Sequence, residues 1–156
     1  MERALAQARL AAVRGEVPVG AVLLHDGRIL AESHNRVLAE RDPTAHAEMN
    51  VLREGARILR NERLVGATLV VTLEPCPMCL GAAILARIDR LVYAASDPKS
   101  GAAGSVFDLA RSERLNHRIE VVGGLRSKEA AEVLREFFLE RRRGAGEVER
   151  ARLEIG

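Results

Sequence analysis

Cys76 and Cys79 lie at the junction of a predicted strand and a predicted helix, where both sulfurs could bind one metal ion. Residues 70–73 form an apolar, β-type run that Pro75 stops. Pro77 suits the first turn of a helix, because the N–H groups of that turn have no partner within the helix and proline's missing N–H costs no hydrogen bond there. Cysteines three apart at a helix start lie on one face, and the positive end of the helix favours their thiolates. Two thiolates alone do not make a catalytic site.

His46 and Glu48 could complete such a site from a second segment, Pro-Thr-Ala-His-Ala-Glu. One histidine and two cysteines supply three ligands and leave the fourth tetrahedral position to water, the open pattern of catalytic zinc. Glu48 would not need to bind the metal and could instead carry protons. The sequence therefore predicts a hydrolytic zinc site with His46, Cys76 and Cys79 as metal ligands and Glu48 as the catalytic residue.

The chemistry that fits this set is the hydrolysis of an amidine C–N bond in a nucleobase. Glu48 would take a proton from water and pass protons to the ring nitrogen and to the departing amine, which leaves as ammonia. Residues two apart on a regular helix point about 200° apart. His46 and Glu48 can therefore share a pocket only if both lie in the first turn of their helix.

Two other readings of the cysteine pair remain open. Without the upstream segment, Cys-x-x-Cys after a strand would indicate a thioredoxin-like redox pair. A closed structural zinc site would need a fourth ligand, for which His25, His34 and His117 are the remaining histidines. We expect His25 to face solvent beside a hairpin turn, and His34 and His117 to be loop or substrate-edge residues. Glu74 is predicted to be a structural carboxylate rather than a second base.

Composition predicts one cytoplasmic domain over residues 1–156. The chain is 47% apolar and long enough to bury a core, and its N-terminus lacks the apolar run of a signal peptide or membrane span. Two cysteines so close together cannot join distant parts of a fold, which favours a reducing compartment. The net charge is only +2, and Lys99 and Lys128 are the only lysines among 24 basic residues, so a grip on nucleic acid would depend mostly on arginine.

Hydrophobic patterning predicts an α/β fold, a three-layer α/β/α sandwich around a mixed five-stranded sheet. Strands are predicted at residues 17–24, 28–33, 67–73, 90–95 and 118–122. Helices are predicted at residues 2–14, 45–60 and 127–142, and a further helix begins at the two cysteines. Residues 34–44 and 96–105 are predicted loops, 106–110 one helical turn, and 143–156 a frayed tail or short surface helix. Thr44 is the predicted N-cap of the second helix. Strand, helix, strand implies a parallel pair, with ligands at the carboxyl edge.

With these residues identified, the sequence resembles the bacterial tRNA-specific adenosine deaminases, which have a cytidine deaminase-like fold, over nearly its whole length. His-x-Glu with Pro-Cys-x-x-Cys occurs across the zinc deaminases of this fold. The Gly-Ala-Ala-Gly-Ser loop and the Phe-Phe-x-x-Arg-Arg helix resemble the tRNA enzymes in particular. The matching stretches are residues 17–22, 35–36, 42–48, 72–79, 97–105, 115–118, 137–138 and 141–142.

The resemblance implies conversion of the wobble adenosine of a tRNA anticodon, usually in an arginine tRNA, to inosine. It also implies one zinc ion per subunit and a homodimer with each active site near the subunit interface. By position, Asn35 would contact the flipped nucleoside, and Asp97, Lys99 and Ser100 would contact neighbouring ribose or phosphate groups. Phe138 and Arg142 would line the groove for the anticodon loop, whereas Phe137 is assigned to the core.

Three functions are therefore consistent with the sequence. The first is the zinc-dependent deamination of tRNA adenosine. The second uses the same chemistry on a small molecule such as cytosine, cytidine or guanine. The third is a structural zinc or redox module without enzymatic activity.

Overall fold

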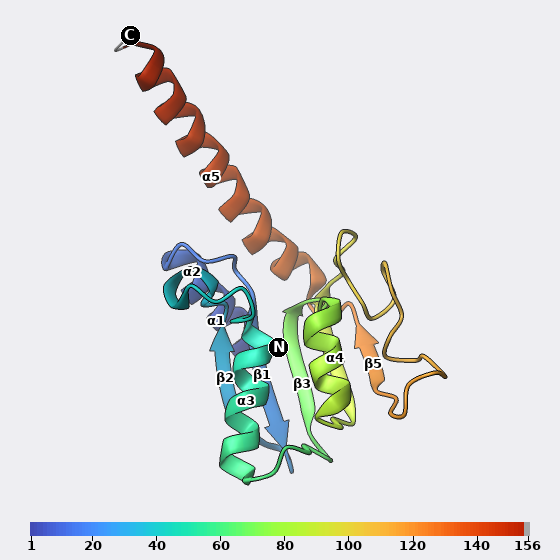
Figure 1. Cartoon of the computed structure of the whole chain (residues 1–156). Coiled ribbons are helices and arrows are strands. Elements are labelled where there is room, and N and C mark those ends of the chain that lie inside the picture. Colours follow the sequence, from blue (N-terminus) through green and yellow to red (C-terminus); the bar gives the residue numbers. More distant parts are fainter. Residues whose placement is uncertain (155–156) are drawn as a thin grey trace.

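The computed structural model describes the backbone of residues 1–154 and the side chains of residues 1–143. A five-stranded sheet lies between two pairs of helices, with a short helix at one end and a long loop along one side (Figure 1). The elements in chain order are α1 (Glu2–Val13), β1 (Gly20–His25), β2 (Arg28–His34), α2 (Val37–Glu40), α3 (Ala47–Leu59), β3 (Thr68–Leu73), α4 (Pro77–Leu85), β4 (Arg90–Ala95), β5 (Glu120–Gly123) and α5 (Ser127–Glu154).

The sheet is mixed, as predicted, with the strand order β2-β1-β3-β4-β5. β1 pairs antiparallel with both β2 and β3, whereas β3–β4 and β4–β5 are parallel pairs. The predicted parallel pair across the cysteine helix is therefore confirmed. β1 begins at Gly20 rather than at residue 17, because Pro18 has no N–H to donate to a ladder. A Cβ on Gly20 would lie 2.1 Å from the carbonyl oxygen of Ala4, so only glycine lets α1 pack this close.

Helices cover both faces of the sheet, which confirms the three-layer prediction (Figure 1). Neighbouring strand residues point to opposite faces. Leu23 and Leu69 pack in the core cluster that includes Val51 of α3 and Leu80 of α4, whereas Val22 packs with Ala4 of α1 on the other face. Burying one such aliphatic side chain stabilises the fold by about 1.5–3 kcal/mol.

Three local predictions are wrong. The segment 34–44 is not all loop, because His34 ends β2 and α2 follows. Residues 106–110 form no helical turn, and Asp108 instead makes a β-bridge with Ala103. The last helix does not end near residue 142, because α5 continues to Glu154 and projects beyond the body of the protein (Figure 1). Arginine, glutamate and alanine favour helix strongly enough to carry it past two glycines.

No helix in the described part of the chain is long and apolar enough to cross a membrane.

Candidate metal centre and active site

The first turn of α3 carries His46 and Glu48. His46 is the N-cap, with extended backbone angles (φ −70°, ψ 153°), and Glu48 is the second helical residue. The prediction that Thr44 caps this helix is wrong, because the N–H and hydroxyl of Thr44 both donate to Asp42 Oδ1, at 2.7 and 2.8 Å. The first helical N–H, that of Ala47, instead donates to Asn35 Oδ1 at 2.9 Å. His46 and Glu48 thus meet the first-turn condition derived from the sequence.

The start of α4 brings both cysteines to the same end of the sheet. Cys76 is the N-cap, Pro77 is the first helical residue, and Cys79 lies buried one turn along. β3 ends just before this helix, so the two sulfurs lie at the carboxyl edge of the parallel strands. The predicted site therefore lies at the predicted edge.

The three predicted ligands converge on one point. His46 Nδ1 lies 3.8 Å from Cys76 Sγ and 3.5 Å from Cys79 Sγ, and all three donor atoms lie within 4.8 Å of one another. A tetrahedral zinc ion with bonds of about 2.3 Å to sulfur and about 2.0–2.1 Å to nitrogen would separate a sulfur from a nitrogen by about 3.6 Å. The donor set and its spacing therefore fit zinc.

The Glu48 carboxyl lacks a hydrogen-bond partner at one of its oxygens. Its Oε2 is the one buried side-chain oxygen or nitrogen in the described part of the chain that has no hydrogen-bond partner. Burial raises the pKa of the Glu48 carboxyl above its ordinary value. Buried polar atoms without a partner are rare in folded proteins, and one that lines a cavity indicates a missing ligand or water. A carboxyl with a raised pKa can also both accept and return a proton.

The cysteines and His46 form a proton-sharing cluster when no metal is bound. The Cys79 thiol donates to Cys76, and together with His46 it lowers the Cys76 pKa to about 4. The same contact and burial raise the pKa of Cys79. The Cys76 thiolate raises the pKa of His46 through their hydrogen bond. Metal ligation needs a neutral imidazole and two thiolates, so zinc must displace protons from His46 and Cys79.

A cavity of about 350 Å³ opens onto these groups. Such a volume falls in the range of small-molecule sites, roughly 300–1,000 Å³. Asn35, His46, Glu48 and Cys76 line it. Asn35 is buried, and its Oδ1 is already used by the start of α3, so its amide nitrogen is the group it can offer to a ligand.

The loop after β4 also lines the cavity, through Asp97 and Ser100. Asp97 Oδ1 accepts from the N–H groups of Lys99 and Ser100, and Oδ2 accepts from the Ser100 hydroxyl at 2.6 Å. Burial alone would raise the pKa of Asp97, but these hydrogen bonds outweigh it and lower the pKa. Glu74, predicted to be structural, fixes this loop through four hydrogen bonds, from the N–H groups of Asp97, Ala103 and Ser105 and from the Ser105 hydroxyl.

The other predicted RNA contacts lie outside the cavity lining. Lys99 and Arg142 are exposed, and Phe138 is 42% exposed, whereas Phe137 is buried as predicted. Arg141 lines the cavity instead, and its Nη2 donates to the Gly15 carbonyl at 2.7 Å. Arg141 was not predicted from the sequence, although its position four residues after Phe137 places it on the same face of α5 as that ring.

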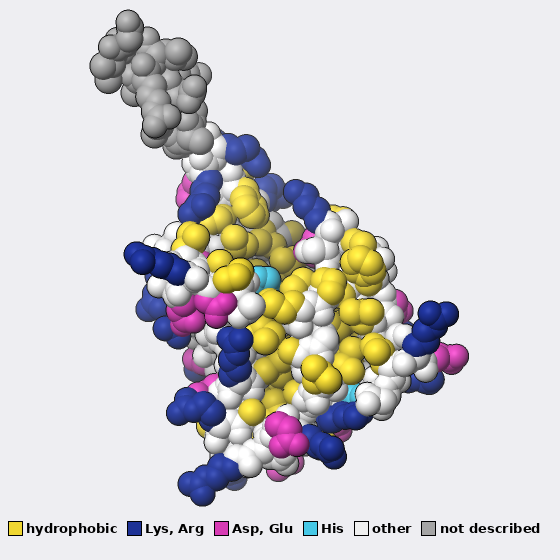
Figure 2. All heavy atoms as spheres, viewed as in Figure 1, with side chains coloured by type: hydrophobic (Ala, Val, Ile, Leu, Met, Phe, Trp, Pro, Cys, Tyr) yellow, Lys and Arg dark blue, Asp and Glu magenta, His cyan; other side chains and the backbone are white. Residues whose placement is uncertain are grey.

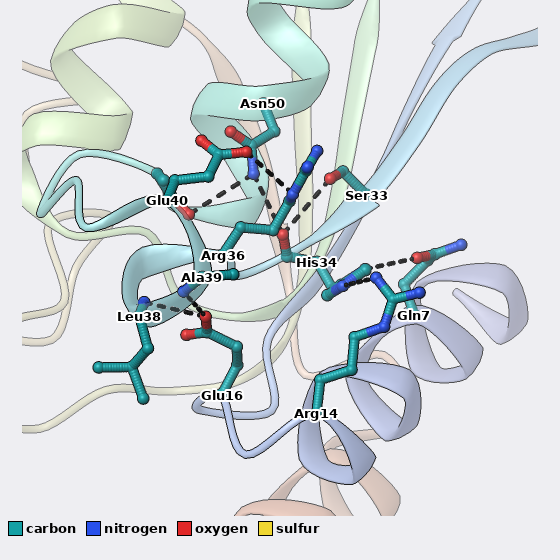
Figure 3. Close-up of polar contacts among 11 residues, drawn as sticks. Gln7, Arg14, Glu16, Ser33, His34, Arg36, Leu38, Ala39, Glu40 and Asn50 are labelled. Atoms are coloured by element: carbon teal, nitrogen blue, oxygen red, sulfur yellow. Dashed lines mark hydrogen bonds and ion pairs between the residues drawn. The ribbon is translucent and has the colours of Figure 1, made fainter.

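The remaining histidines lie away from the ligand cluster. His34 is buried, contrary to the prediction of a loop or substrate-edge residue, and hydrogen-bonds Gln7 and Arg14 (Figure 3). The prediction that His25 faces solvent is also wrong, because its side chain is only 24% exposed and Nε2 lies 3.1 Å from the Val65 carbonyl. His117 Nε2 contacts the Ile88 carbonyl at 2.7 Å. None of these three belongs to the group of potential ligands found in the described residues.

Comparison with known proteins identifies the family of this site. Residues 1–95 match the cytidine and deoxycytidylate deaminase zinc-binding region, a span that contains His46, Cys76 and Cys79. The chain is 47% identical over 143 residues to the tRNA-specific adenosine deaminase of Bacillus subtilis, covering 92% of this chain and 89% of that protein. This chain belongs to the tRNA-specific adenosine deaminase family.

Solved structures agree with this family assignment. A tRNA:A34 deaminase, described in a study of A-to-I editing at the wobble position of transfer RNA, is 50% identical with a TM-score of 0.83, over 86% of this chain and 97% of that one. The guanine deaminase of Nitrosomonas europaea is 28% identical with a TM-score of 0.73, over 87% of this chain and 81% of that one. The tRNA:A34 deaminase is thus nearer than this guanine deaminase in both sequence and structure.

Proposed function

We propose that this protein deaminates adenosine to inosine at the wobble position of a tRNA anticodon. The observation that carries the proposal is the unpartnered, buried Glu48 Oε2 beside His46 and the two sulfurs, on the wall of a nucleoside-sized cavity. The family to which the chain belongs supports tRNA adenosine as the substrate.

His46, Cys76 and Cys79 would hold one zinc ion per subunit. When bound, zinc would lower the pKa of water towards neutrality, which makes water a nucleophile at physiological pH. Glu48 would accept the proton of the attacking water, which adds to C6 of adenine. It would pass this proton to N1 of the purine ring. It would then take the second proton, from the new hydroxyl on C6, and deliver it to the exocyclic amine, so that ammonia leaves and inosine remains.

Asn35 is the residue on this wall suited to orient the base. Its Nδ2 amide can donate to a purine acceptor, while the bond from Ala47 keeps the side chain from rotating. Asp97, Lys99 and Ser100 would contact the ribose and phosphate groups next to the target. Phe138 and Arg142, exposed on α5, would receive the anticodon loop by stacking and by phosphate contact.

A homodimer is part of this proposal. Hydrophobic side chains gather on the face that α3 and α4 cover (Figure 2). On these helices Ile58 is 48% and Leu85 is 77% exposed, and Met49 and Ala82 are half-buried. Large exposed apolar patches mark interaction sites. Because α3 and α4 also carry the site residues, this interface would lie close to the active site. Leu85→Glu should then convert dimers to monomers in analytical ultracentrifugation, whereas Val13→Glu, on α1, should not.

The proposal extends to the chain as a whole. Residues 1–156 would act as one deaminase domain in the cytoplasm, where Cys76 and Cys79 stay reduced and tRNA is available. The proposed tRNA substrate is an arginine tRNA. Residues 155–156 of the predicted tail lie outside the described part of the chain.

Guanine deamination is the second candidate, favoured by the likeness to the Nitrosomonas europaea enzyme. A free base needs no contacts beyond the cavity, so Lys99→Ala and Arg142→Ala would leave its turnover unchanged. Turnover of a stem-loop would instead fall in both variants.

The test is a deamination assay with purified, zinc-loaded protein. The substrates are an anticodon stem-loop of arginine tRNA with adenosine at the wobble position, the same stem-loop with the adenosine one position away, and free guanine and cytidine. The proposal expects inosine at the wobble position only. Turnover of guanine or cytidine without any reaction of the stem-loop would replace it with the second reading.

A further inference from the structure

The short helix α2 has no N-terminal cap of its own. It spans four residues, and the side chain of its N-cap residue Arg36 pairs with Glu40 and accepts no hydrogen bond from a helical N–H. The first N–H groups of any helix lack intrahelical acceptors, and a single turn is too short to be stable alone. α2 therefore needs acceptors from elsewhere in the chain.

Glu16, in the segment between α1 and β1, supplies them. Its Oε1 accepts hydrogen bonds from the N–H groups of Leu38 and Ala39, at 2.9 and 2.8 Å (Figure 3). These are the second and third residues of α2, whose N–H groups an N-cap side chain normally satisfies. The negative charge also suits the positive end of the helix. Glu16 is only 2% exposed, and its Oε1 accepts both of these hydrogen bonds.

The residues that Glu16 holds form part of the cavity wall. Val37 and Leu38 line the cavity that Asn35 and Glu48 also line. Leu38 is 60% exposed, so little packing holds its side chain in place. Its position at the cavity therefore depends on the backbone of α2, and through it on Glu16.

The segment that bears Glu16 is itself fixed on both sides. Arg14 Nη1 contacts His34 Nε2 at 3.1 Å (Figure 3), and the Gly15 carbonyl accepts from Arg141 of α5 at 2.7 Å. The cap is thus attached to α1, β2 and α5 rather than to a free loop. A preorganised wall loses less conformational freedom when a ligand binds.

We infer that Glu16 is a positioning residue for the target nucleoside: by capping α2, it holds Val37 and Leu38 as the apolar wall against which the flipped nucleoside binds. This inference rests on the proposed function, because it takes the occupant of the cavity to be a nucleoside within RNA. Glu16 lines the same cavity, and the role inferred for it is the one it exerts through α2.

Two substitutions separate the cap from the charge. Glu16→Gln keeps an oxygen that can accept both N–H groups, whereas Glu16→Ala removes it. Glu16→Ala should lower kcat/KM for the stem-loop about tenfold, mostly through KM, because losing a helix cap is worth about that factor. Glu16→Gln should stay within about twofold of wild type, since the acceptor remains. Glu32→Ala, which removes a surface pair with Arg3, is the matched control and should change neither constant.

A double-mutant cycle with Leu38→Ala tests whether Glu16 acts through α2. If it does, Glu16→Ala should raise KM by a smaller factor in Leu38→Ala enzyme than in wild type, because only the Val37 part of the wall remains to be disturbed. Effects that multiply would overturn the inference, as would a Glu16→Gln enzyme as impaired as Glu16→Ala. Zinc content and melting temperature, measured on each variant, exclude general damage to the fold.

Amide hydrogen exchange measures the cap independently of activity. The N–H groups of Leu38 and Ala39 should exchange slowly in wild type and Glu16→Gln, and at least tenfold faster in Glu16→Ala. Glu16→Asp, one methylene shorter, should behave like Glu16→Ala and serves if the alanine variant does not fold. Slow exchange at both amides without the Glu16 acceptor would overturn the inference, even if wild type made no inosine. Inosine formation by wild type with no loss in Glu16→Ala would overturn this inference alone and leave the proposed function standing.

Discussion

Glu74 Oε1 accepts a hydrogen bond from the main-chain N–H of Ala103 at 2.9 Å, across 29 residues of sequence. Glu74 lies between the end of β3 and Cys76, so the residue next to the zinc-side strand also fixes the loop after β4, which lines the same cavity. Both oxygens are used, since Oε2 accepts from Asp97 N–H at 3.0 Å and from the Ser105 hydroxyl. One buried carboxylate therefore sets the distance between the metal site and the loop proposed to contact RNA.

Glu74→Gln should destabilise the protein although it is nearly isosteric. The amide nitrogen would face N–H or O–H donors, and at least one buried donor would lose its acceptor. The expected loss in the free energy of unfolding is about 1–3 kcal/mol. Urea denaturation checks this, with Glu32→Gln, at an exposed ion pair, as the control. Equal stability of Glu74→Gln and wild type would show that the loop does not depend on this carboxylate.

Gly101→Ala should also loosen the loop. A Cβ at Gly101 would lie 2.5 Å from Glu74 Cδ and 2.6 Å from the Asp97 carbonyl oxygen. Overpacking of this kind typically destabilises by about 1–3 kcal/mol. Gly81→Ala is the matched control, because its Cβ would meet no atom within 4 Å and α4 would gain up to about 1 kcal/mol of helix propensity. The two melting temperatures should therefore move in opposite directions, and a rise in both would contradict this reading of the loop.

Zinc removal should abolish activity, and rebinding should release protons. The raised pKa of His46 and of Cys79 means that both hold protons which the metal displaces, so apparent zinc affinity should rise with pH. Calorimetry in buffers of different ionisation enthalpy counts these protons. Cys79→Ser should weaken zinc binding by more than about 100-fold, since even outer-sphere partners are worth 10–100-fold. Met78→Leu, between the two cysteines, should bind zinc like wild type, and zinc binding without proton release would contradict the assigned protonation states.

His34 should resist protonation and should make the fold sensitive to acid. Arg14 can only donate, so His34 Nε2 is the acceptor and Nδ1–H donates to Gln7 Oε1 at 3.1 Å. Burial, followed by the charges of Arg14 and Arg36, lowers the His34 pKa, while Glu16 opposes them. Because the unfolded chain binds this proton more readily, stability is present above pH 6.5, the ordinary histidine value, and falls as the pH drops below it.

Arg14→Gln tests this assignment by NMR titration of the His34 ring. Removing the guanidinium charge should raise the titration midpoint of His34 and reduce the loss of stability between pH 6.5 and 5. Arg57→Gln, at an exposed pair on α3, serves as the control. An unchanged midpoint in Arg14→Gln would mean that Arg14 does not set the charge state of His34.

The metal centre could be predicted from sequence because its geometry is local. His46 with Glu48, and Cys76 with Cys79, each lie in one helical turn, and the strand-helix order brings both turns to one edge. Glu16 could not be predicted in the same way, since its partners Leu38 and Ala39 are more than 20 residues away and α2 is too short to show a hydrophobic period. Arg142 was predicted instead of Arg141 because their side chains point about 100° apart on the helix, and the motif alone does not show which of the two faces the cavity.

The proposed function depends on Glu48 moving protons during hydrolysis at the site made by His46, Cys76 and Cys79. The decisive experiment is the rate of inosine formation at the wobble position by Glu48→Gln enzyme whose zinc content equals that of wild type. Glu48→Gln keeps the shape of the side chain but cannot carry a proton, so kcat should fall at least about 100-fold with the stem-loop still bound. A Glu48→Gln enzyme with full zinc and wild-type kcat would contradict it.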